Sequence, residues 1–281
     1  MSKTIAVQGR QVPSFFYGTA WKEDRTADLT RLALLAGFRA IDTANQRKHY
    51  FEAAVGQAVQ SQIAAGVVQR SELFLQTKFT HLDGQDSRLP YDRKAPPSEQ
   101  VIQSFASSLA HLGTDYVDSY VLHGPSAAHR FTEEDWQVWQ AMLALKDAGK
   151  TRLLGVSNVS LGHLESLCRN DGSKPAFVQN RCYARTGWDR EVRALCRQHN
   201  IVYQGFSLLT ANHRALESPT VARIAARTQR TPAQVVFRFA LTVGMIPLTG
   251  TSDPQHMQQD LESYDFELGD KDVEAIERVE V

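Results

Sequence analysis

Residues 98–123 read SEQVIQSFASSLAHLGTDYVDSYVLH and contain one helix followed by one strand. Over residues 98–111 the apolar side chains recur every three or four positions, which predicts an amphipathic helix. Gly113 follows, at the place where a left-handed residue often ends a helix. Residues 116–123 are rich in tyrosine and valine, which favours a β-strand ending at His123. Such helix–strand units are the repeating element of parallel α/β folds.

The same alternation runs along the whole chain. After a predicted hairpin over residues 4–13 we expect eight strands, at residues 15–18, 40–42, 73–78, 116–123, 153–157, 176–179, 202–206 and 245–248. Helical patterns lie between them, at residues 26–36, 50–64, 98–111, 131–148, 161–170, 188–199 and 231–243. Eight strand–helix pairs favour an α/β fold of the (β/α)8 TIM barrel class with a short N-terminal β-hairpin. An open doubly wound sheet would carry a G-x-G-x-x-G motif after its first strand, and this sequence has none.

The composition is that of a globular protein. Of the 281 residues 42% are hydrophobic and 22% are charged, so we expect one domain over residues 1–281 with a sizeable core. The 31 basic and 31 acidic residues cancel, so no overall field attracts nucleic acid or a membrane. The polar start Ser2-Lys3-Thr4 and the absence of a run of about 18 apolar residues predict a cytoplasmic protein. We expect a monomer.

Polar residues stand at the ends of the predicted strands. In a parallel barrel the carboxyl ends of all strands meet on one rim, where barrel enzymes have their active sites. Any one polar strand end is most simply a solvated terminus, but their joint placement on one rim indicates a site. The residues are Asp42, Lys78, His123, Ser157, Asn158, Gln179, Phe206, Ser207, Thr249, Gly250 and Thr251.

Several stretches of the sequence resemble the aldo-keto reductases, from about residue 18 to residue 260. They are GTAW (18–21), GFRAIDTA (37–44), LFLQTK (73–78), YVDSYVLHGP (116–125), GVSN (155–158) and TPAQV (231–235). Each is a weak signal alone, whereas their order and spacing together are specific. The resemblance implies a barrel enzyme that uses a nicotinamide cofactor to reduce an aldehyde or ketone to an alcohol.

The family's catalytic set is an aspartate, a tyrosine, a lysine and a histidine. Hydride transfer to a carbonyl carbon leaves negative charge on the oxygen, which needs a proton donor. A lysine ammonium beside the tyrosine is expected to lower the pKa of the phenol, and the aspartate keeps the lysine charged. A neutral imidazole orients the carbonyl. The resemblance assigns these roles to Asp42, Lys78 and His123 directly.

The tyrosine does not align directly. In the family's usual pattern it lies five residues after the aspartate, where this chain has Arg47. Counting back from Gly56 instead reaches His49, with Tyr50 beside it, so the turn over residues 45–50 is longer than usual. We predict Tyr50 as the proton donor because a phenol fits the chemistry. His49 is the rival donor, and Tyr50 as an aromatic packed on the outer layer of the barrel is the structural alternative.

The resemblance also implies a nicotinamide dinucleotide site. It implies that Ser157, Asn158 and Gln179 bind the carboxamide and that Phe206 stacks on the nicotinamide ring. It also implies that the phosphates bind to backbone amides after residue 206 and at a helix start near residue 253. The family often has a lysine and an arginine at the 2'-phosphate, whereas this chain has Gly250 and His256. We expect NADP(H) with a modest preference, and NAD(H) as a second cofactor. The predicted cofactor residues are Gly18, Thr19, Ser157, Asn158, Gln179, Phe206, Ser207, Leu208, Gly250, Thr251, Ser252, His256, Gln259 and Asp260.

The substrate is expected to be a small-molecule carbonyl compound, with Trp21, Tyr91 and Tyr183 as candidate pocket residues. Residues 80–97 form a long loop on the predicted reactive face, and the helical pattern at 270–278 leaves no long tail to cover the mouth, so we expect an open site. One alternative function is a non-catalytic NADP(H)-binding redox-sensing subunit. A metal-dependent barrel hydrolase ranks last because no H-x-H pair occurs, and no metal is expected.

Overall fold

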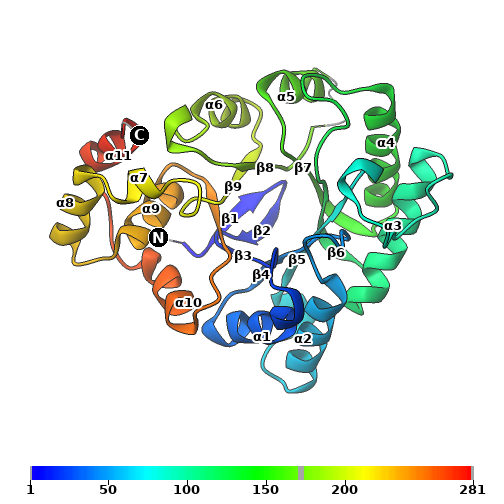
Figure 1. Cartoon of the computed structure of the whole chain (residues 1–281), viewed down its shortest axis with the longest axis horizontal. Helices are drawn as coiled ribbons and strands as arrows, with labels where there is room; N and C mark the ends of the chain where they lie inside the picture. The colour runs from blue at the N-terminus through cyan, green and yellow to red at the C-terminus, as the bar shows by residue number, and fades with distance from the viewer. Residues whose placement is uncertain (1, 170–173, 280–281) are drawn as a thin grey trace.

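Eight parallel strands close into a barrel in the computed structural model, which describes residues 2–169 and 174–279 (Figure 1). Their order around the barrel is β10-β3-β4-β5-β6-β7-β8-β9. The strands are β3 (Phe16–Gly18), β4 (Ala40–Asp42), β5 (Phe74–Phe79), β6 (Val117–Leu122), β7 (Thr151–Ser157), β8 (Phe177–Arg181), β9 (Val202–Phe206) and β10 (Ile246–Thr249). The predicted (β/α)8 barrel is therefore confirmed, and no strand boundary differs from the prediction by more than two residues.

A ring of helices surrounds the barrel (Figure 1). They are α1 (Thr26–Ala36), α2 (Glu52–Ala64), α3 (Pro97–Leu112), α4 (Glu133–Asp147), α5 (Leu161–Cys168), α6 (Arg190–Gln198), α7 (His213–Leu216), α8 (Pro219–Thr228), α9 (Pro232–Thr242), α10 (Pro254–Leu261) and α11 (Asp270–Glu277). The predictions did not include α7 and α8. The predicted helix end at Asn170 lies outside the described residues.

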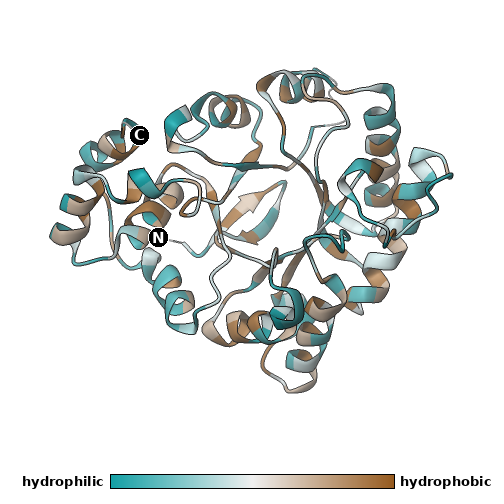
Figure 2. Ribbon diagram, viewed as in Figure 1, coloured by the Kyte–Doolittle hydropathy of each residue, from teal (hydrophilic) through white to brown (hydrophobic). Residues whose placement is uncertain are grey.

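The predicted hairpin closes one end of the barrel. Strands β1 (Thr4–Val7) and β2 (Arg10–Pro13) pair antiparallel and lie at the centre of the ring in Figure 1. Val7 and Val12 are buried in one apolar cluster with Phe74 and Phe177, at the first residues of β5 and β8. Figure 2 shows apolar residues on the hairpin at the centre, inside a ring of helices that carry both polar and apolar residues. The opposite end, where the strands finish, stays open for a site.

Helix ends follow the local sequence signals. Gly37 and Gly113 end α1 and α3 in the left-handed conformation, with φ of 113° and 65°, which a residue without a Cβ adopts at little cost. Thr231 caps α9, where its side chain accepts a hydrogen bond from the amide of Gln234. Within the described ranges, no helix is both long and apolar enough to cross a membrane.

Candidate active site

The carboxyl ends of the barrel strands surround a cavity of about 1780 Å³. This volume exceeds the roughly 300–1,000 Å³ of a pocket for one drug-sized ligand, so there is room for a dinucleotide and a substrate together. Asp42, Tyr50 and His123 line the cavity at one end. Gln259 and Asp260 of α10 line it at the other, so the predicted catalytic and cofactor residues share one continuous space.

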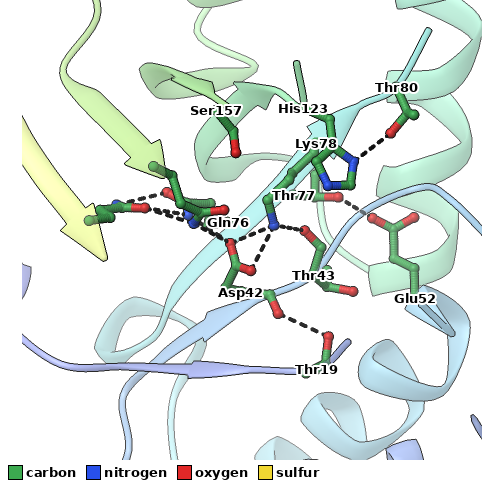
Figure 3. Close-up of polar contacts among 12 residues, drawn as sticks. Thr19, Asp42, Thr43, Glu52, Gln76, Thr77, Lys78, Thr80, His123 and Ser157 are labelled. Atoms are coloured by element: carbon green, nitrogen blue, oxygen red, sulfur yellow. Dashed lines mark hydrogen bonds and ion pairs between the residues drawn. The ribbon is translucent and has the colours of Figure 1, made fainter. Parts of the chain in front are cut away.

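Lys78 and Asp42 form a buried ion pair at the floor of the site (Figure 3). The ammonium of Lys78 donates hydrogen bonds of 2.7 Å to each carboxylate oxygen of Asp42 and one of 2.8 Å to the carbonyl oxygen of Thr43. Lys78 has no exposed surface. Burial lowers the pKa of Lys78, while the charge of Asp42 opposes this shift. The carboxylate therefore favours the charged ammonium, although burial is the larger of the two effects.

Three buried glutamines support Asp42 from inside the barrel. Gln76 and Gln179 donate to Asp42 Oδ1 at 2.8 and 3.0 Å, and both donate to Gln204 Oε1 at 2.9 Å. A carboxylate only accepts hydrogen bonds, so Asp42 fixes the amide nitrogen of Gln179 toward itself. The amide oxygen of Gln179 is thereby left on the cavity side. Gln76 and Gln204 were not predicted, although a glutamine inside an apolar strand is a usable signal.

Tyr50 lies between Lys78 and His123. The Lys78 nitrogen is 5.1 Å from the centre of the Tyr50 ring. The rings of Tyr50 and His123 meet edge to face, with 5.7 Å between their centres. Tyr50 precedes α2, whose first residue is Glu52, instead of lying inside the helix as predicted. The longer turn is thus absorbed before the helix begins.

His123 is held as a neutral imidazole. Its Nδ1 atom is 2.8 Å from the hydroxyl oxygen of Thr80 (Figure 3). Burial, followed by the positive charge of Lys78, lowers the pKa of His123 to about 3. The ring is therefore uncharged at any physiological pH.

The pKa of Tyr50 differs from the prediction. Burial, with a smaller contribution from the charge of Asp42, raises the pKa of Tyr50 well above its usual range. We expected Lys78 to lower it. The reason for the difference is burial, which disfavours the charged phenolate more strongly than Lys78 favours it. The carboxylate of Asp42, 2.7 Å from the Lys78 nitrogen, offsets part of the charge of Lys78.

His49 also lines the cavity, beside Trp21, which is 67% exposed. Its ring stacks on the indole of Trp21, with centres 4.0 Å apart and planes 36° apart. The backbone amide of Trp21 donates to the carbonyl oxygen of His49 at 2.8 Å. Burial and the neighbouring Lys48 lower the pKa of His49. The two candidate donors thus occupy different environments, and only Tyr50 contacts both Lys78 and His123.

Most of the predicted binding residues line the cavity. They are Gly18, Ser157, Asn158, Gln179, Phe206, Ser207, Leu208, Gly250, Thr251, Ser252, His256, Gln259 and Asp260, together with Trp21 and Tyr183, which were predicted as substrate residues. Thr19 does not line it, because its hydroxyl is buried and donates to the carbonyl oxygen of Asp42 at 2.9 Å. Tyr91 is also wrong as a pocket residue. It is 6% exposed, and its hydroxyl donates to the carbonyl oxygen of Thr80 at 2.8 Å inside the long loop.

The start of α10 differs from the predicted phosphate site. Asp253 caps this helix, and its side chain accepts hydrogen bonds from the amides of Gln255 and His256 at 2.8 and 3.4 Å. Two of the amides expected to bind phosphate are therefore already partnered by a carboxylate. At the other end of α10, burial raises the pKa of Asp260 to about 6, and Thr249 donates to its carboxylate at 2.7 Å. No cluster of metal-ligating side chains occurs among residues 2–169 and 174–279.

Lys22, Arg25 and Arg181, which were not predicted, also line the cavity. Lys22 and Arg25 belong to the segment between β3 and α1, just after the GTAW motif. A pair of basic residues directly after a barrel strand was the available sequence signal, but nothing in the sequence placed them beside β10.

Comparisons with known proteins agree with this architecture. The family model described as "Aldo/keto reductase family" matches residues 14–281. An aldo-keto reductase of Mycolicibacterium vanbaalenii is 34% identical over 258 residues, which cover 92% of this chain and 84% of that protein. The crystal structure of an aldo/keto reductase from Brucella melitensis matches with a TM-score of 0.82 and 28% identity over 98% of both chains. The Bombyx mori aldo-keto reductase in complex with NADP also has a TM-score of 0.82, at 25% identity over 98% of this chain and 92% of that one. This chain belongs to the aldo/keto reductase family.

Proposed function

We propose that this protein is an NADP(H)-dependent reductase that converts an aldehyde or ketone to an alcohol. The observation that carries the proposal is the position of the Tyr50 phenol, which contacts both the buried cation Lys78 and the neutral imidazole of His123 in the large cavity. Family membership supports nicotinamide-dependent oxidoreduction. The NADP complex of the Bombyx mori relative supports the choice of cofactor.

The residues at the ends of β7 and β8 fit a nicotinamide carboxamide. Asn158 donates its amide hydrogens to the carbonyl oxygen of His123 at 2.8 Å and to Ser157 Oγ at 3.2 Å. Its amide oxygen, like that of Gln179, makes no hydrogen bond within the described part of the chain. Two amide oxygens facing one cavity are suited to accept the two N–H groups of a carboxamide. When bound there, the reduced cofactor supplies a hydride to the carbonyl carbon.

Tyr50 then donates its proton to the carbonyl oxygen. An alkoxide is a stronger base than a phenolate, so this transfer is favourable even though the pKa of Tyr50 is raised. The phenolate that remains lies beside the Lys78 ammonium, which stabilises the negative charge until solvent returns a proton.

His123 holds the carbonyl in place. The Thr80 hydroxyl lies 2.8 Å from His123 Nδ1, and we assign the hydroxyl as the donor of this hydrogen bond, which puts the ring proton on Nε2. A neutral Nε2–H group donates a hydrogen bond without bringing a second positive charge close to Lys78. His123 therefore orients the substrate oxygen toward Tyr50, and Trp21 and Tyr183 bound the substrate side of the cavity.

A turnover assay tests the proposal. The purified protein should oxidise NADPH steadily when simple aldehydes, ketones and sugars are supplied, and the alcohol should accumulate in equal amount. A redox-sensing subunit would bind NADPH, quench tryptophan fluorescence and give no steady oxidation. Binding without turnover across the whole substrate panel would contradict the enzyme assignment.

The pH profile of reduction should be flat from about pH 6 to pH 9. A proton donor must be protonated, so reduction is lost as the pH rises through the donor's pKa. Tyr50 has a raised pKa and keeps its proton over this range, and His123, with a pKa of about 3, stays neutral. If His49 were the donor, kcat would depend on an imidazole whose pKa is lowered from its usual value near 6.5. At every pH above 6.5, kcat would then fall about tenfold for each pH unit. Measuring kcat for one aldehyde at saturating NADPH from pH 5 to pH 9.5 distinguishes the two.

A further inference from the structure

The segment between β3 and α1 brings two positive side chains to the end of β10. Lys22 donates a hydrogen bond to the carbonyl oxygen of Gly250. The guanidinium of Arg25 lies 3.5 Å from the carbonyl oxygen of Ser252. Both side chains line the cavity beside Thr251, Ser252 and His256. Residues separated by more than 220 positions in the sequence therefore form one wall.

Neither cation has an acidic partner within residues 2–169 and 174–279. Their neighbour Arg47, by contrast, pairs with Glu23 at 3.6 Å. Burial and the like charge of Arg25 lower the pKa of Lys22 to about 8. Two adjacent cations without a counter-charge repel each other, and an anion bound between them would remove this repulsion.

The ammonium of Lys22 lies beside Gly250, a position that carries no side chain. A Cβ atom at Gly250 would lie 3.6 Å from the Lys22 nitrogen, so the ammonium stands next to the place where a side chain at position 250 would begin. Positions 250 and 256 are the two at which the family often has a lysine and an arginine, and this chain has Gly250 and His256 there. The carboxylate of Asp253 already occupies the start of α10, so a phosphate there needs positive charge from elsewhere.

We propose that Lys22 and Arg25 bind the 2'-phosphate of NADP(H) and set the preference for NADP(H) over NAD(H). The inference rests on the proposed function. A phosphomonoester carries close to two negative charges, which a lysine and an arginine together balance, and the arginine fork matches two phosphate oxygens. The hydroxyls of Thr251 and Ser252 add neutral donors on the same wall. The expected selectivity is therefore larger than positions 250 and 256 alone predict.

Titrations of NADPH and NADH, followed by quenching of tryptophan fluorescence at fixed salt, test this inference. The unmodified protein should bind NADPH at least about 100-fold more tightly than NADH, since each charge-assisted contact accounts for about tenfold or more. Arg25→Gln and Lys22→Gln should each raise the Kd of NADPH about 10- to 100-fold. The Kd of NADH should change less than about threefold, and the double variant should bind both cofactors about equally. Arg10→Gln, on the hairpin at the opposite end of the barrel, removes the same charge and should change neither Kd.

The outcomes separate the inference from the proposed function. If the variants raise both Kd values equally, the two cations bind phosphates that both cofactors carry, and the inference fails. Unchanged NADPH binding in the double variant would also overturn it, while leaving the reductase assignment intact. Failure of the unmodified protein to bind either cofactor would refute both.

Discussion

Replacing Tyr50 with phenylalanine should lower kcat for carbonyl reduction by about 10²- to 10⁴-fold, the range expected when a general acid is lost. The substitution removes only the phenolic oxygen and keeps the ring between Lys78 and His123. That oxygen makes no hydrogen bond with the described residues, so its loss leaves no protein group unpaired. The melting temperature and the Kd of NADPH should therefore stay close to those of the unmodified protein. Stopped-flow measurement of NADPH oxidation under single-turnover conditions gives the rate of the chemical step directly.

His49→Ala is the matched variant for this experiment. It removes the rival donor, together with the stack on Trp21, and should reduce kcat much less than Tyr50→Phe. A change in KM is expected instead, because the rings of His49 and Trp21 both line the cavity. If Tyr50→Phe keeps near-native reduction while His49→Ala loses it, the proton comes from the imidazole and Tyr50 has no part in the step.

The barrel was predictable because its signal repeats. Each strand and helix carries its own periodic pattern, so errors of one or two residues at a boundary leave the count of eight strands unchanged. The eight predicted parallel strands also placed the polar strand ends on one rim, since parallel strands finish at the same end of a barrel. Asp42, Lys78 and His123 were placed in this way, and the structure brings all three within one site.

Contacts between distant segments were not predictable. Tyr91 lies in the long loop on the predicted reactive face, so it was expected to line the pocket. Its hydroxyl instead donates a hydrogen bond to the carbonyl oxygen of Thr80 within the same loop. Lys22 and Arg25 reach the cofactor site that we propose only because β3 pairs with β10, which brings these two side chains against the loop that follows Thr249. The pKa of Tyr50 depends in the same way on three-dimensional burial, which no local pattern contains.

Lys78→Met should lower kcat by about 10²- to 10³-fold, because the phenolate formed at Tyr50 loses the cation that stabilises it. NADPH should still bind with a Kd within about threefold of the native value, since Lys78 has no exposed surface and lies behind the cavity wall. The variant will also be less stable. It leaves the Asp42 carboxylate buried without its cation, which costs about 3–5 kcal/mol of unfolding free energy.

The double variant Asp42→Asn/Lys78→Met separates catalysis from stability. It removes both charges, and the amide at position 42 can still accept hydrogen bonds from Gln76 and Gln179. Urea unfolding should therefore show that most of the lost stability returns, because no unpaired charge remains buried. Turnover should stay at least about 10²-fold below native, since Tyr50 still lacks its cation. Recovery of native turnover together with stability would mean that Lys78 serves only to hold the barrel together, and that the phenolate at Tyr50 needs no neighbouring positive charge.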